Sequence, residues 1–538
     1  MTTKNVETDV LIIGSGAIGA TYARLLVNHG KKVTMIDSGP QRSTRPGWHL
    51  LNEFRYQHEP NLSLDTMFSN REVFSIPGKR HDLTKASPGS TSGGRYDPIL
   101  ERLNFQNPDQ NADLNMHDAA VMYSVGGMFS LWSGFAPSPE PFERTPLISD
   151  AEWDVVLPIA HKLYDTHDDA FEPSVVAGGI RKVLGDEGYN VHSPVMGAKK
   201  RGFKSDLAHF VTWTGADTIL GPLADDPERF KDRFEILAEH RAEKLVMDEG
   251  HSEVNYATVR DLTNFQEKRI RADTFIVAGG AFLTPRLLWQ SGIRPFALGR
   301  YLHENTVATC KIGLGKDVID AIRENPANPE SGSIIPIPWN DPAPKVSFAP
   351  TRDKPWMGHI SRTGRTMLYD LPQDVRLTMD MTWYGTVEPR PENRITFSDT
   401  INDRFGQPQI TFEYRPGPDD AALASRMLEE LATIAPKIGG YLPLARPPFT
   451  SGPALQPPGA SLHMMGTYRM GDDSDDSVVD ADSQVWGMEN LYLGGLGVLP
   501  NKIASNPTLT ASAIAIKSAS HILGLAISDL EEKPELAR

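Results

Sequence analysis

The sequence predicts an α/β fold in which separate stretches of the chain return to one parallel sheet and a second unit is built on a mostly antiparallel sheet with helices. Three apolar runs, at residues 10–14, 270–280 and 491–495, each end in glycine, which is typical of buried parallel strands that turn into a loop or helix. Residues 306–460 contain alternating segments and many prolines, which is typical of antiparallel strands. We therefore expect two domains, each made of several segments.

The first element is an apolar strand at 10–13, which runs into Gly-Ser-Gly-Ala-Ile-Gly. This is the glycine fingerprint of a turn that binds a dinucleotide between a strand and a helix. Gly14 makes the tight turn, Gly16 lets a pyrophosphate approach the backbone, and Gly19 lets the helix lie close to the sheet. The helix stops near Gly30, and its first N–H groups face the phosphates.

A second strand at 33–36 follows this helix and delivers Asp37. At this distance along the chain, a carboxylate accepts hydrogen bonds from the ribose of a dinucleotide and repels a phosphate on that ribose. Asp-Ser-Gly is also a common turn sequence, so Asp37 alone does not distinguish a ribose-binding carboxylate from an ordinary turn residue. The two strands, the helix and the acidic residue together favour a nucleotide-binding motif over an ordinary strand-turn-helix that binds nothing.

The composition excludes several classes of partner. The chain has 538 residues, a net charge of −15 and no run of basic residues, which disfavours nucleic acid and anionic membranes and favours a small neutral substrate. Cys310 is the only cysteine, so an internal disulfide is excluded and a small buried residue is expected there. The first strand begins near Met1 and no apolar run reaches membrane-spanning length, so we expect a cytoplasmic protein without a membrane anchor.

An ordered stretch interrupts the irregular part of the chain that follows. Residues 41–115 are rich in Pro, Gly, Ser and Asn, and this composition predicts loops over a site. Residues 123–134 then contain Gly126 and Gly127, which let the backbone come very close to a ligand. The apolar and hydroxyl residues after them are suited to line a flat ring system, although a plain turn is the alternative.

The later elements are predicted from periodicity and from helix-end signals. Residues 234–246 predict two short strands, and the strand at 270–280 leads into a helix that ends at Gly292. Residues 419–435 have the apolar spacing of a covering helix, which Pro436 is expected to stop. The last helix begins at Asn506-Pro507 and continues to about Leu523, with Asn at the N-cap and Pro at the first helical position.

Several motifs resemble the glucose-methanol-choline oxidoreductases, flavoproteins that oxidise alcohols, and the resemblance covers most of the chain. It is most specific for the pyranose oxidase branch and the related bacterial glycoside 3-oxidases. The motifs are VGGMFSLW at 125–132, LGRYLHEN at 298–305, SLHMMGTYRMG at 461–471, and LYLGGLGVLP followed by NPTLT. In the wider family an Asp usually follows the last strand, whereas Gly495 is found here, as in the pyranose oxidase branch.

The resemblance implies FAD as the cofactor, held by positions spread over the chain. These are Gly14, Gly16, Ala17, Ile18, Gly19, Asp37, Ser38, Gly126, Gly127, Met128, Trp132, Ser133, Ala242, Ala278, Gly279, Gly495, Asn506, Pro507 and Thr508. Ser133 falls where pyranose oxidase has a threonine near the reactive nitrogen of the flavin. Pyranose oxidase attaches its flavin through a histidine, and because the matching residue here is Leu131, we expect FAD to be bound without a covalent link.

The resemblance also implies a division of the chain into two domains. A Rossmann-like FAD-binding domain is expected from residues 1–50, 116–150, 205–305 and 461–538. The substrate domain and covering loops are expected from residues 51–115, 151–204 and 306–460. Within the latter, residues 355–364 resemble the mobile substrate loop of pyranose oxidase, and Gly358 and Gly364 favour mobility; a surface turn is the alternative.

His463 and Asn506 match the catalytic residues of the family. Oxidation of a secondary alcohol removes a hydroxyl proton and a hydride, and neutral His463 suits the proton because an imidazole has a pKa of roughly 6.5. Asn506 is able to hold the same hydroxyl over the flavin. Taken singly, a histidine at the position of His463 is more often a core residue, and Asn506 alone is an N-cap, so only their joint occurrence with the flavin motifs supports the catalytic interpretation.

The leading hypothesis is therefore FAD-dependent oxidation of a secondary ring hydroxyl of a sugar or glycoside, with oxygen or another electron acceptor. A dehydrogenase that passes electrons to a quinone or a protein is a close alternative. A non-redox lyase of the same family and a cofactor-binding interaction protein are further alternatives. No metal is expected, because the acidic run at 472–476 lacks the spacing of a calcium loop. The sugar, the carbon oxidised and the number of subunits are left open.

Overall fold

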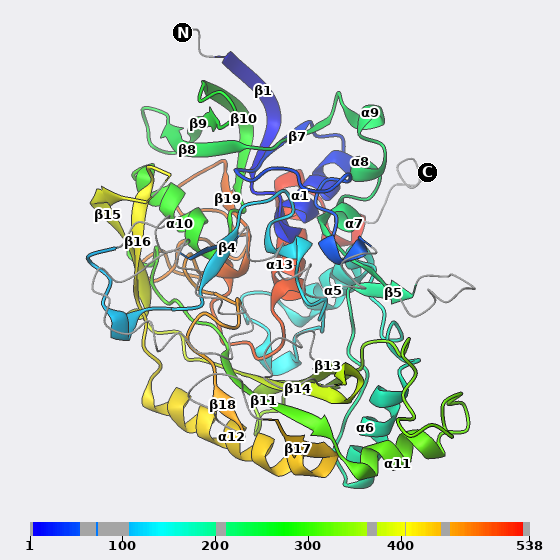
Figure 1. Cartoon of the computed structure of the whole chain (residues 1–538). Helices are drawn as coiled ribbons and strands as arrows, with labels where there is room; N and C mark the ends of the chain where they lie inside the picture. Colours follow the sequence, from blue (N-terminus) through cyan, green and yellow to red (C-terminus); the bar gives the residue numbers. More distant parts are fainter. Residues whose placement is uncertain are drawn as a thin grey trace.

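A mixed sheet and an antiparallel sheet, each covered by helices, form the body of the protein (Figure 1). This computed structural model describes residues 4–53, 71–73, 107–200, 211–362, 374–403, 405–442 and 452–530. The predicted α/β fold is confirmed. Within the described part of the chain, no helix combines the length and the apolar character that a bilayer-spanning segment needs.

The first sheet has the strand order β7-β2-β1-β10-β9-β8, with β19 also paired to β10. Its strands are β1 (Lys4–Ile13), β2 (Val33–Ile36), β7 (Phe234–Leu237), β8 (His240–Met247), β9 (Val254–Asp261), β10 (Glu267–Val277) and β19 (Leu491–Leu493). The three glycine-ended strands predicted from the sequence, β1, β10 and β19, are parallel neighbours here. The two short strands predicted at 234–246 correspond to β7 and β8.

Strand β10 belongs to two parts of this sheet. Along 267–270 it pairs with β9 in an antiparallel arrangement, and along 275–277 it pairs with β19 in parallel. The other edge of β10 pairs with β1 along nearly its whole length. The sheet therefore forks, with the β8–β9 hairpin on one branch and the C-terminal strand on the other.

The main hydrophobic core is formed by the first sheet together with a group of helices. They are α1 (Ala17–Asn28), α5 (Asp150–Tyr164), α7 (Ala216–Leu220), α8 (Pro222–Asp225), α9 (Pro227–Phe230), α10 (Gly280–Gln290) and α13 (Thr508–Leu523). Every residue of α1 is buried, and α13 lies between α1 and α5 (Figure 1). The Ser512 hydroxyl lies 2.6 Å from that of Tyr164 and 3.3 Å from that of Thr21, which links the three helices.

The second sheet is antiparallel, as predicted, with the order β12-β13-β14-β11-β17 and β18 paired to β11. Its strands are β11 (Thr306–Leu314), β12 (Lys345–Phe348), β13 (Trp356–Arg362), β14 (Thr378–Gly385), β17 (Gly439–Tyr441) and β18 (Ala454–Leu455). Helices α6 (Val175–Asp186), α11 (Lys316–Glu324) and α12 (Pro418–Ile438) pack with it. Figure 1 shows α12 running along the lower side of this sheet.

The two faces of the second sheet differ in chemistry because side chains alternate along a strand. One face carries apolar residues such as Cys310, Met381 and Ile360, which belong to the core shared with α12 and α6. On the other face Thr309, Thr382 and His359 lie opposite one another across β11, β14 and β13. The apolar face therefore packs on helices, and the polar face is left for the site described below. Cys310 is buried, as expected.

Short hairpins and short helices complete the described chain. The hairpins are β3 (Arg71–Val73) with β4 (Ala120–Met122), β5 (Ala198–Lys200) with β6 (Val211–Trp213), and β15 (Arg394–Asn402) with β16 (Pro408–Glu413). The 3-10 helices are η1 (Leu50–Asn52), η3 (Ala112–Leu114), η4 (Gly127–Ser130), η5 (Pro141–Glu143), η7 (Val375–Leu377), η8 (Leu496–Val498) and η9 (Ile527–Leu530).

Two local predictions need correction. Residues 356–362 form the buried strand β13, with Met357 only 2% exposed, so they are not a mobile loop. Gly364 lies outside the described residues.

Pro436 does not stop α12, which continues to Ile438, because a proline close to the C-terminus of a helix interrupts little further hydrogen bonding. Helix α5 packs against α13 in the first core. The exact domain boundaries stay a prediction.

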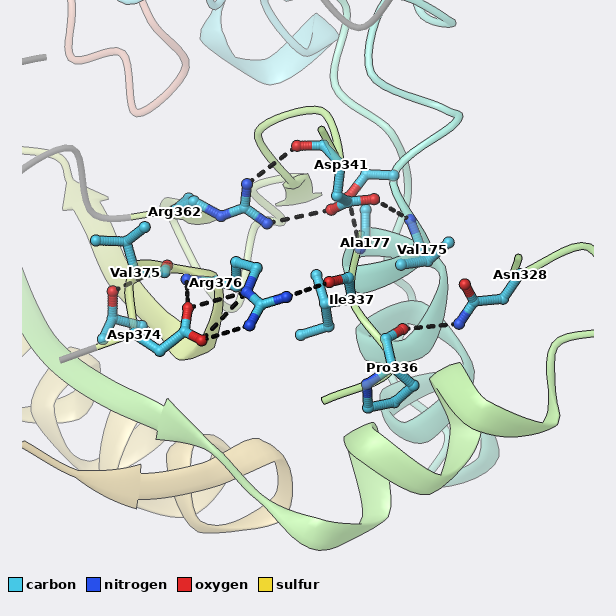
Figure 2. A network of polar contacts seen from close by, with 12 residues as sticks. Val175, Ala177, Asn328, Pro336, Ile337, Asp341, Arg362, Asp374, Val375 and Arg376 are labelled. Carbon is cyan, nitrogen blue, oxygen red and sulfur yellow. Dashed lines mark hydrogen bonds and ion pairs between the residues drawn. The ribbon is translucent and has the colours of Figure 1, made fainter. Parts of the chain in front are cut away.

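A network of polar contacts joins the outer end of the second sheet to the start of α6 (Figure 2). The Asp341 carboxylate accepts hydrogen bonds from the Val175 N–H at 2.7 Å and from the Ser174 hydroxyl at 2.8 Å. Arg362, the last residue of β13, donates to the same carboxylate and to the Asp341 carbonyl, both at 3.1 Å. The side chains of Asp341 and Arg362 are only 1% and 15% exposed. Two buried opposite charges therefore fasten β13 to helix α6.

Replacement of Asp341 by Asn is expected to destabilise the protein strongly. The amide keeps the size of the side chain, but it leaves the Arg362 guanidinium buried without its counter-charge, and such a loss costs about 3 kcal/mol or more. Asp186→Asn is the matched control, because it breaks the Lys182–Asp186 pair, whose side chains are 56% and 68% exposed, and an ion pair screened by water contributes little to stability. Urea unfolding of both variants measures the two effects, and equal small losses would contradict the assignment.

Candidate active site

A cavity of about 520 Å³ lies at the carboxyl ends of the parallel strands. Gly14 and Gly16 follow β1, Asp37 follows β2, Ala278 follows β10 and Gly495 follows β19, and all of them line the cavity. The carboxyl ends of parallel strands meet at one edge of a sheet, where ligands of doubly wound folds bind. Segments far apart in the sequence therefore meet around one space.

Most of the predicted site residues line this cavity. They are Gly14, Gly16, Ala17, Ile18, Asp37, Ser38, Gly127, Met128, Trp132, Ser133, Ala242, Ala278, Gly279, His463, Gly495, Asn506 and Thr508. Gly19, Gly126 and Pro507 are not part of the lining. Gly19 packs on Gly14, the Gly126 N–H donates to the Ser15 hydroxyl, and Pro507 is the N-cap of α13.

The glycine turn has the geometry that a close approach of phosphate requires. A Cβ atom on Gly14 would collide with the Ala278 carbonyl oxygen, and one on Gly19 would collide with the Gly14 carbonyl oxygen. Both contacts are impossible, so these two glycines are needed for β1, α1 and β10 to pack. A Cβ on Gly16 would lie 3.9 Å from the Gly126 carbonyl oxygen, its nearest contact outside the turn. Gly16 therefore leaves open space between its backbone and the cavity.

Three helices begin at this cavity, and no side chain caps the N-terminus of any of them. They are α1, α10 and α13, whose N-cap residues Gly16, Gly279 and Pro507 provide no side-chain hydrogen bond. The first N–H groups of a helix have no partner within the helix, and its N-terminus carries a partial positive charge. The cavity thus offers several unpaired donors to an anionic or acceptor-rich ligand, which fits the pyrophosphate and ring system of a dinucleotide.

Helix α13 begins one residue later than predicted. Thr508 is its first residue and Pro507 its N-cap, so Pro507 is not at the first helical position. Asn506 precedes the cap, and its carboxamide does not bond the helix backbone. The side chain is instead directed to two histidines, as described below.

Asp37 reaches the cavity with its carboxylate already engaged. It accepts hydrogen bonds from the Ser15 N–H at 3.1 Å, the Ser15 hydroxyl at 2.5 Å and the Gly39 N–H at 2.8 Å. Burial raises the pKa of this carboxyl from its usual value. The Ser15 hydroxyl in turn accepts from the Gly126 N–H at 2.9 Å. Asp37 therefore ties the glycine turn to the Gly126–Gly127 segment, and its contact with a ribose stays a prediction.

His463 and Asn506 meet at the other end of the cavity. The Asn506 Nδ2 lies 3.3 Å from His463 Nε2. On its far side, His463 Nδ1 lies 2.8 Å from the Asn305 Oδ1. Burial lowers the pKa of His463 to about 4, so the imidazole is neutral near pH 7.

The contacts of Asn305 determine which nitrogen of His463 carries the proton. The Asn305 Nδ2 donates to the carbonyl oxygens of Ile503 at 2.7 Å and Gly385 at 3.3 Å. Carbonyl oxygens only accept, so the amide orientation is fixed and Oδ1 must face His463. His463 then donates from Nδ1, and its Nε2 keeps a free lone pair that points to Asn506. A neutral imidazole in this tautomer is ready to accept a proton.

The turn that presents His463 is strained and is held by a buried acid. Leu462 has a φ of +58°, a left-handed conformation that is unfavourable for leucine and is often found at functional sites. The Glu304 carboxylate accepts from the Gly459 N–H and from the Ser461 hydroxyl, both at 2.7 Å. Burial raises the pKa of Glu304 to about 7. These hydrogen bonds hold the turn in the conformation that directs His463 to the cavity.

A second buried acid holds the segment that carries Asn506. One oxygen of Glu143 accepts from the Ala504 N–H at 2.7 Å and the Ser505 N–H at 3.1 Å. The other accepts from the Ser505 hydroxyl at 2.7 Å. Glu143 is 1% exposed. The loop before α13 is therefore fixed immediately next to Asn506.

Sequence reasoning missed three side chains of this site, Asn305, His359 and Tyr384. Asn305 is the last residue of the LGRYLHEN motif, which was a signal that its position matters. His359 lies within 355–364, where the strand was not recognised. Tyr384 lines the cavity with its ring centroid 5.5 Å from that of His463. Nothing in the local sequence shows that either residue faces His463, because this depends on the register of β13 and β14.

The glycine turn, the uncapped helices and the imidazole–carboxamide pair together define a nucleotide-binding α/β protein with an acid–base site. Models of two GMC oxidoreductase domains match residues 227–307 and 389–515, and a model of an FAD binding domain matches residues 7–53.

Similar proteins cover nearly the whole chain. Pyranose 2-oxidase of Tricholoma matsutake is 32% identical, with 96% of this chain and 93% of that protein covered. C-glycoside 3-oxidase of Microbacterium trichothecenolyticum is 29% identical, with 97% and 98% covered. The solved structure of pyridoxine 4-oxidase from Mesorbium loti has a TM-score of 0.64 at 16% identity, over 96% of this chain and 100% of that one, which is a likeness of fold. The chain belongs to the GMC oxidoreductase family, and its cofactor is FAD.

Proposed function

We propose that this protein oxidises a secondary ring hydroxyl of a sugar or glycoside to a ketone. The observation that carries the proposal is the neutral His463, which presents the lone pair of Nε2 beside the Asn506 amide at the wall of the cavity. Support comes from the family and from relatives of nearly equal length that are named as pyranose 2-oxidase and C-glycoside 3-oxidase.

Two side chains divide the work on the hydroxyl group. His463 Nε2 accepts the hydroxyl proton, while Asn305 accepts a hydrogen bond from Nδ1 and stabilises the imidazolium that forms. The Asn506 N–H donates to the substrate oxygen and stabilises the negative charge that develops on it. FAD, when bound, supplies the acceptor for the hydride that leaves the same carbon. The hydroxyl loses one proton to His463 and its carbon loses one hydride, which leaves a ketone.

Aromatic side chains suit a sugar ring at this end of the cavity. Tyr384, Phe135 and Trp132 line it, and aromatic faces pack on the apolar C–H faces of sugars while hydroxyl and amide groups bind the sugar hydroxyls. Phe135 stacks on His359 with centroids 3.7 Å apart, which fixes its orientation. We propose a sugar or a glycoside as the substrate and oxygen or another acceptor for the electrons. Peroxide yield compared with dye reduction identifies the acceptor.

Replacement of His463 by Ala is expected to lower the rate of flavin reduction by a sugar by about 10²- to 10⁴-fold, the usual contribution of a general base. The flavin itself should stay bound, because it is held by other segments. Anaerobic stopped-flow absorbance with a panel of free sugars and glycosides measures this rate. His521→Ala is the control, since the His521 side chain is 42% exposed and lies on α13 away from the site. A near-normal rate in His463→Ala would exclude this residue as the base.

The pH dependence of flavin reduction is expected to follow the lowered pKa of His463. Only a neutral imidazole accepts a proton. Flavin reduction is therefore fast above the pKa of His463 and becomes slow as the pH falls through that pKa. Burial lowers that pKa from 6.5 to about 4, so the rate of flavin reduction should not change with pH at neutral and mildly acidic pH. Single-turnover rates measured across this range should decline only near pH 4. An inflection at the ordinary value for histidine would contradict a desolvated base.

We further propose that FAD is bound without a covalent link. The support is Leu131, which lines the cavity where the resemblance to pyranose oxidase places the attaching histidine, and an alkyl side chain has no nucleophilic atom to offer. Acid precipitation of the purified protein is expected to leave the flavin in the supernatant, as measured by its absorbance. Flavin that stays on the precipitated chain would show a covalent bond at another residue.

A further inference from the structure

His359 lies outside the pair that the proposed function uses, yet its ring reaches the same carboxamide. It is part of β13, is 3% exposed, and stacks on the ring of Phe135. His359 Nε2 lies 2.9 Å from Asn506 Oδ1, a shorter contact than the one between Asn506 and His463. Asn506 is therefore held between two imidazoles, one on each side of its amide.

The direction of the hydrogen bond between His359 and Asn506 follows from the tautomer of His463. His463 offers a lone pair at Nε2, so Asn506 turns its Nδ2 toward it and its Oδ1 toward His359. An amide oxygen only accepts, so His359 carries its proton on Nε2. His359 Nδ1 is then an acceptor, and it lies 3.3 Å from the Ser347 hydroxyl.

The surroundings keep His359 neutral, and its hydrogen bond to Asn506 Oδ1 then selects the tautomer. Burial lowers the pKa of His359 to about 3, and the charges of Lys345, His192 and His463 act in the same direction when these groups are protonated. From β14, Tyr384 faces the ring with centroids 5.6 Å apart, and burial raises the pKa of its hydroxyl to about 12. His359 thus does not exchange protons in the working range of the enzyme and acts as a fixed donor.

We propose that His359 is a positioning residue that holds the Asn506 carboxamide with its N–H groups toward His463 and the substrate oxygen. The catalytic role of His359 rests on the proposed function, whereas the direction of its hydrogen bond to Asn506 does not. Without the His359 donor, the amide is free to rotate and present Oδ1 to His463 Nε2. That orientation stabilises protonated His463 and removes the donor from the substrate oxygen, so both functions of the pair are weakened together.

The first test is a titration that needs no turnover. In the holoenzyme labelled with ¹³C-histidine, NMR measures the pKa of His463 in wild type, His359→Leu and His359→Gln. In His359→Leu the Asn506 Oδ1 has lost its donor and is free to accept a hydrogen bond from protonated His463. This variant is therefore expected to raise the pKa of His463 by about one unit. His359→Gln keeps an N–H donor and should leave it close to the wild-type value. An unchanged pKa in His359→Leu would overturn the proposal.

The second test is a double-mutant cycle on the rate of anaerobic flavin reduction. His359→Leu is expected to lower this rate by roughly 10- to 100-fold, as misplacement of a catalytic group does, while His359→Gln stays within about fivefold of wild type. In an Asn506→Ala background, His359→Leu should change the rate by less than about threefold, because the group that His359 holds is gone. Equal losses in both backgrounds would show an independent role and overturn the proposal.

A control and an independent outcome separate this proposal from the proposed function. His192→Gln changes another histidine whose charge acts on His359, and it should leave both the His463 pKa and the rate near wild type. If no sugar or glycoside reduces the wild-type flavin, the proposed function is wrong, but the titration of His463 still decides the role of His359.

Discussion

The side chain of Asn305 joins the parts of the chain on which the site depends. Its Nδ2 donates to the carbonyl of Gly385 at the end of β14 and to that of Ile503 before α13, while its Oδ1 faces His463. The second sheet, the segment before the last helix and the imidazole are thus held by one amide. Because both carbonyls belong to the main chain, no rotamer or protonation change in a neighbour is able to reverse the orientation of this amide. The orientation of the Asn305 amide therefore sets the direction of the hydrogen bonds that run through His463 and Asn506 to His359.

Burial gives these polar groups their chemical character. Desolvation keeps His463 and His359 neutral, and a neutral imidazole has one donor and one acceptor nitrogen, so each ring has a direction. In water the same residues would exchange protons and tautomers freely. Buried acids have the complementary role: Glu304 and Glu143 accept hydrogen bonds from the two loops that carry His463 and Asn506. The protein therefore holds its base neutral and uses carboxylates to fix the backbone around it.

The sequence predicts those features of the fold and site that have a local signal. The glycine turn at 14–19, the returning strands and the last helix each depend on residues close together in the chain, and the structure places them as expected. The pairing of Asn305 with His463 joins residues far apart in sequence, and an asparagine before a strand has no pattern of its own. Likewise, Gly358 suggested a loop, but it lies in the middle of β13, where Phe348 and Trp383 pack against its backbone.

The order of strands in the first sheet has a consequence for how the protein folds. β1 pairs with β10, and β10 in turn pairs with β19, while α13 covers α1. Contacts of such long sequence separation form slowly, since the loops between them must close first. The apolar surfaces of β1 and α1 therefore stay without their final neighbours until β10 and α13 have been made. A nascent chain of this kind exposes hydrophobic surface while the intervening residues are synthesised, a situation in which chaperones are commonly needed.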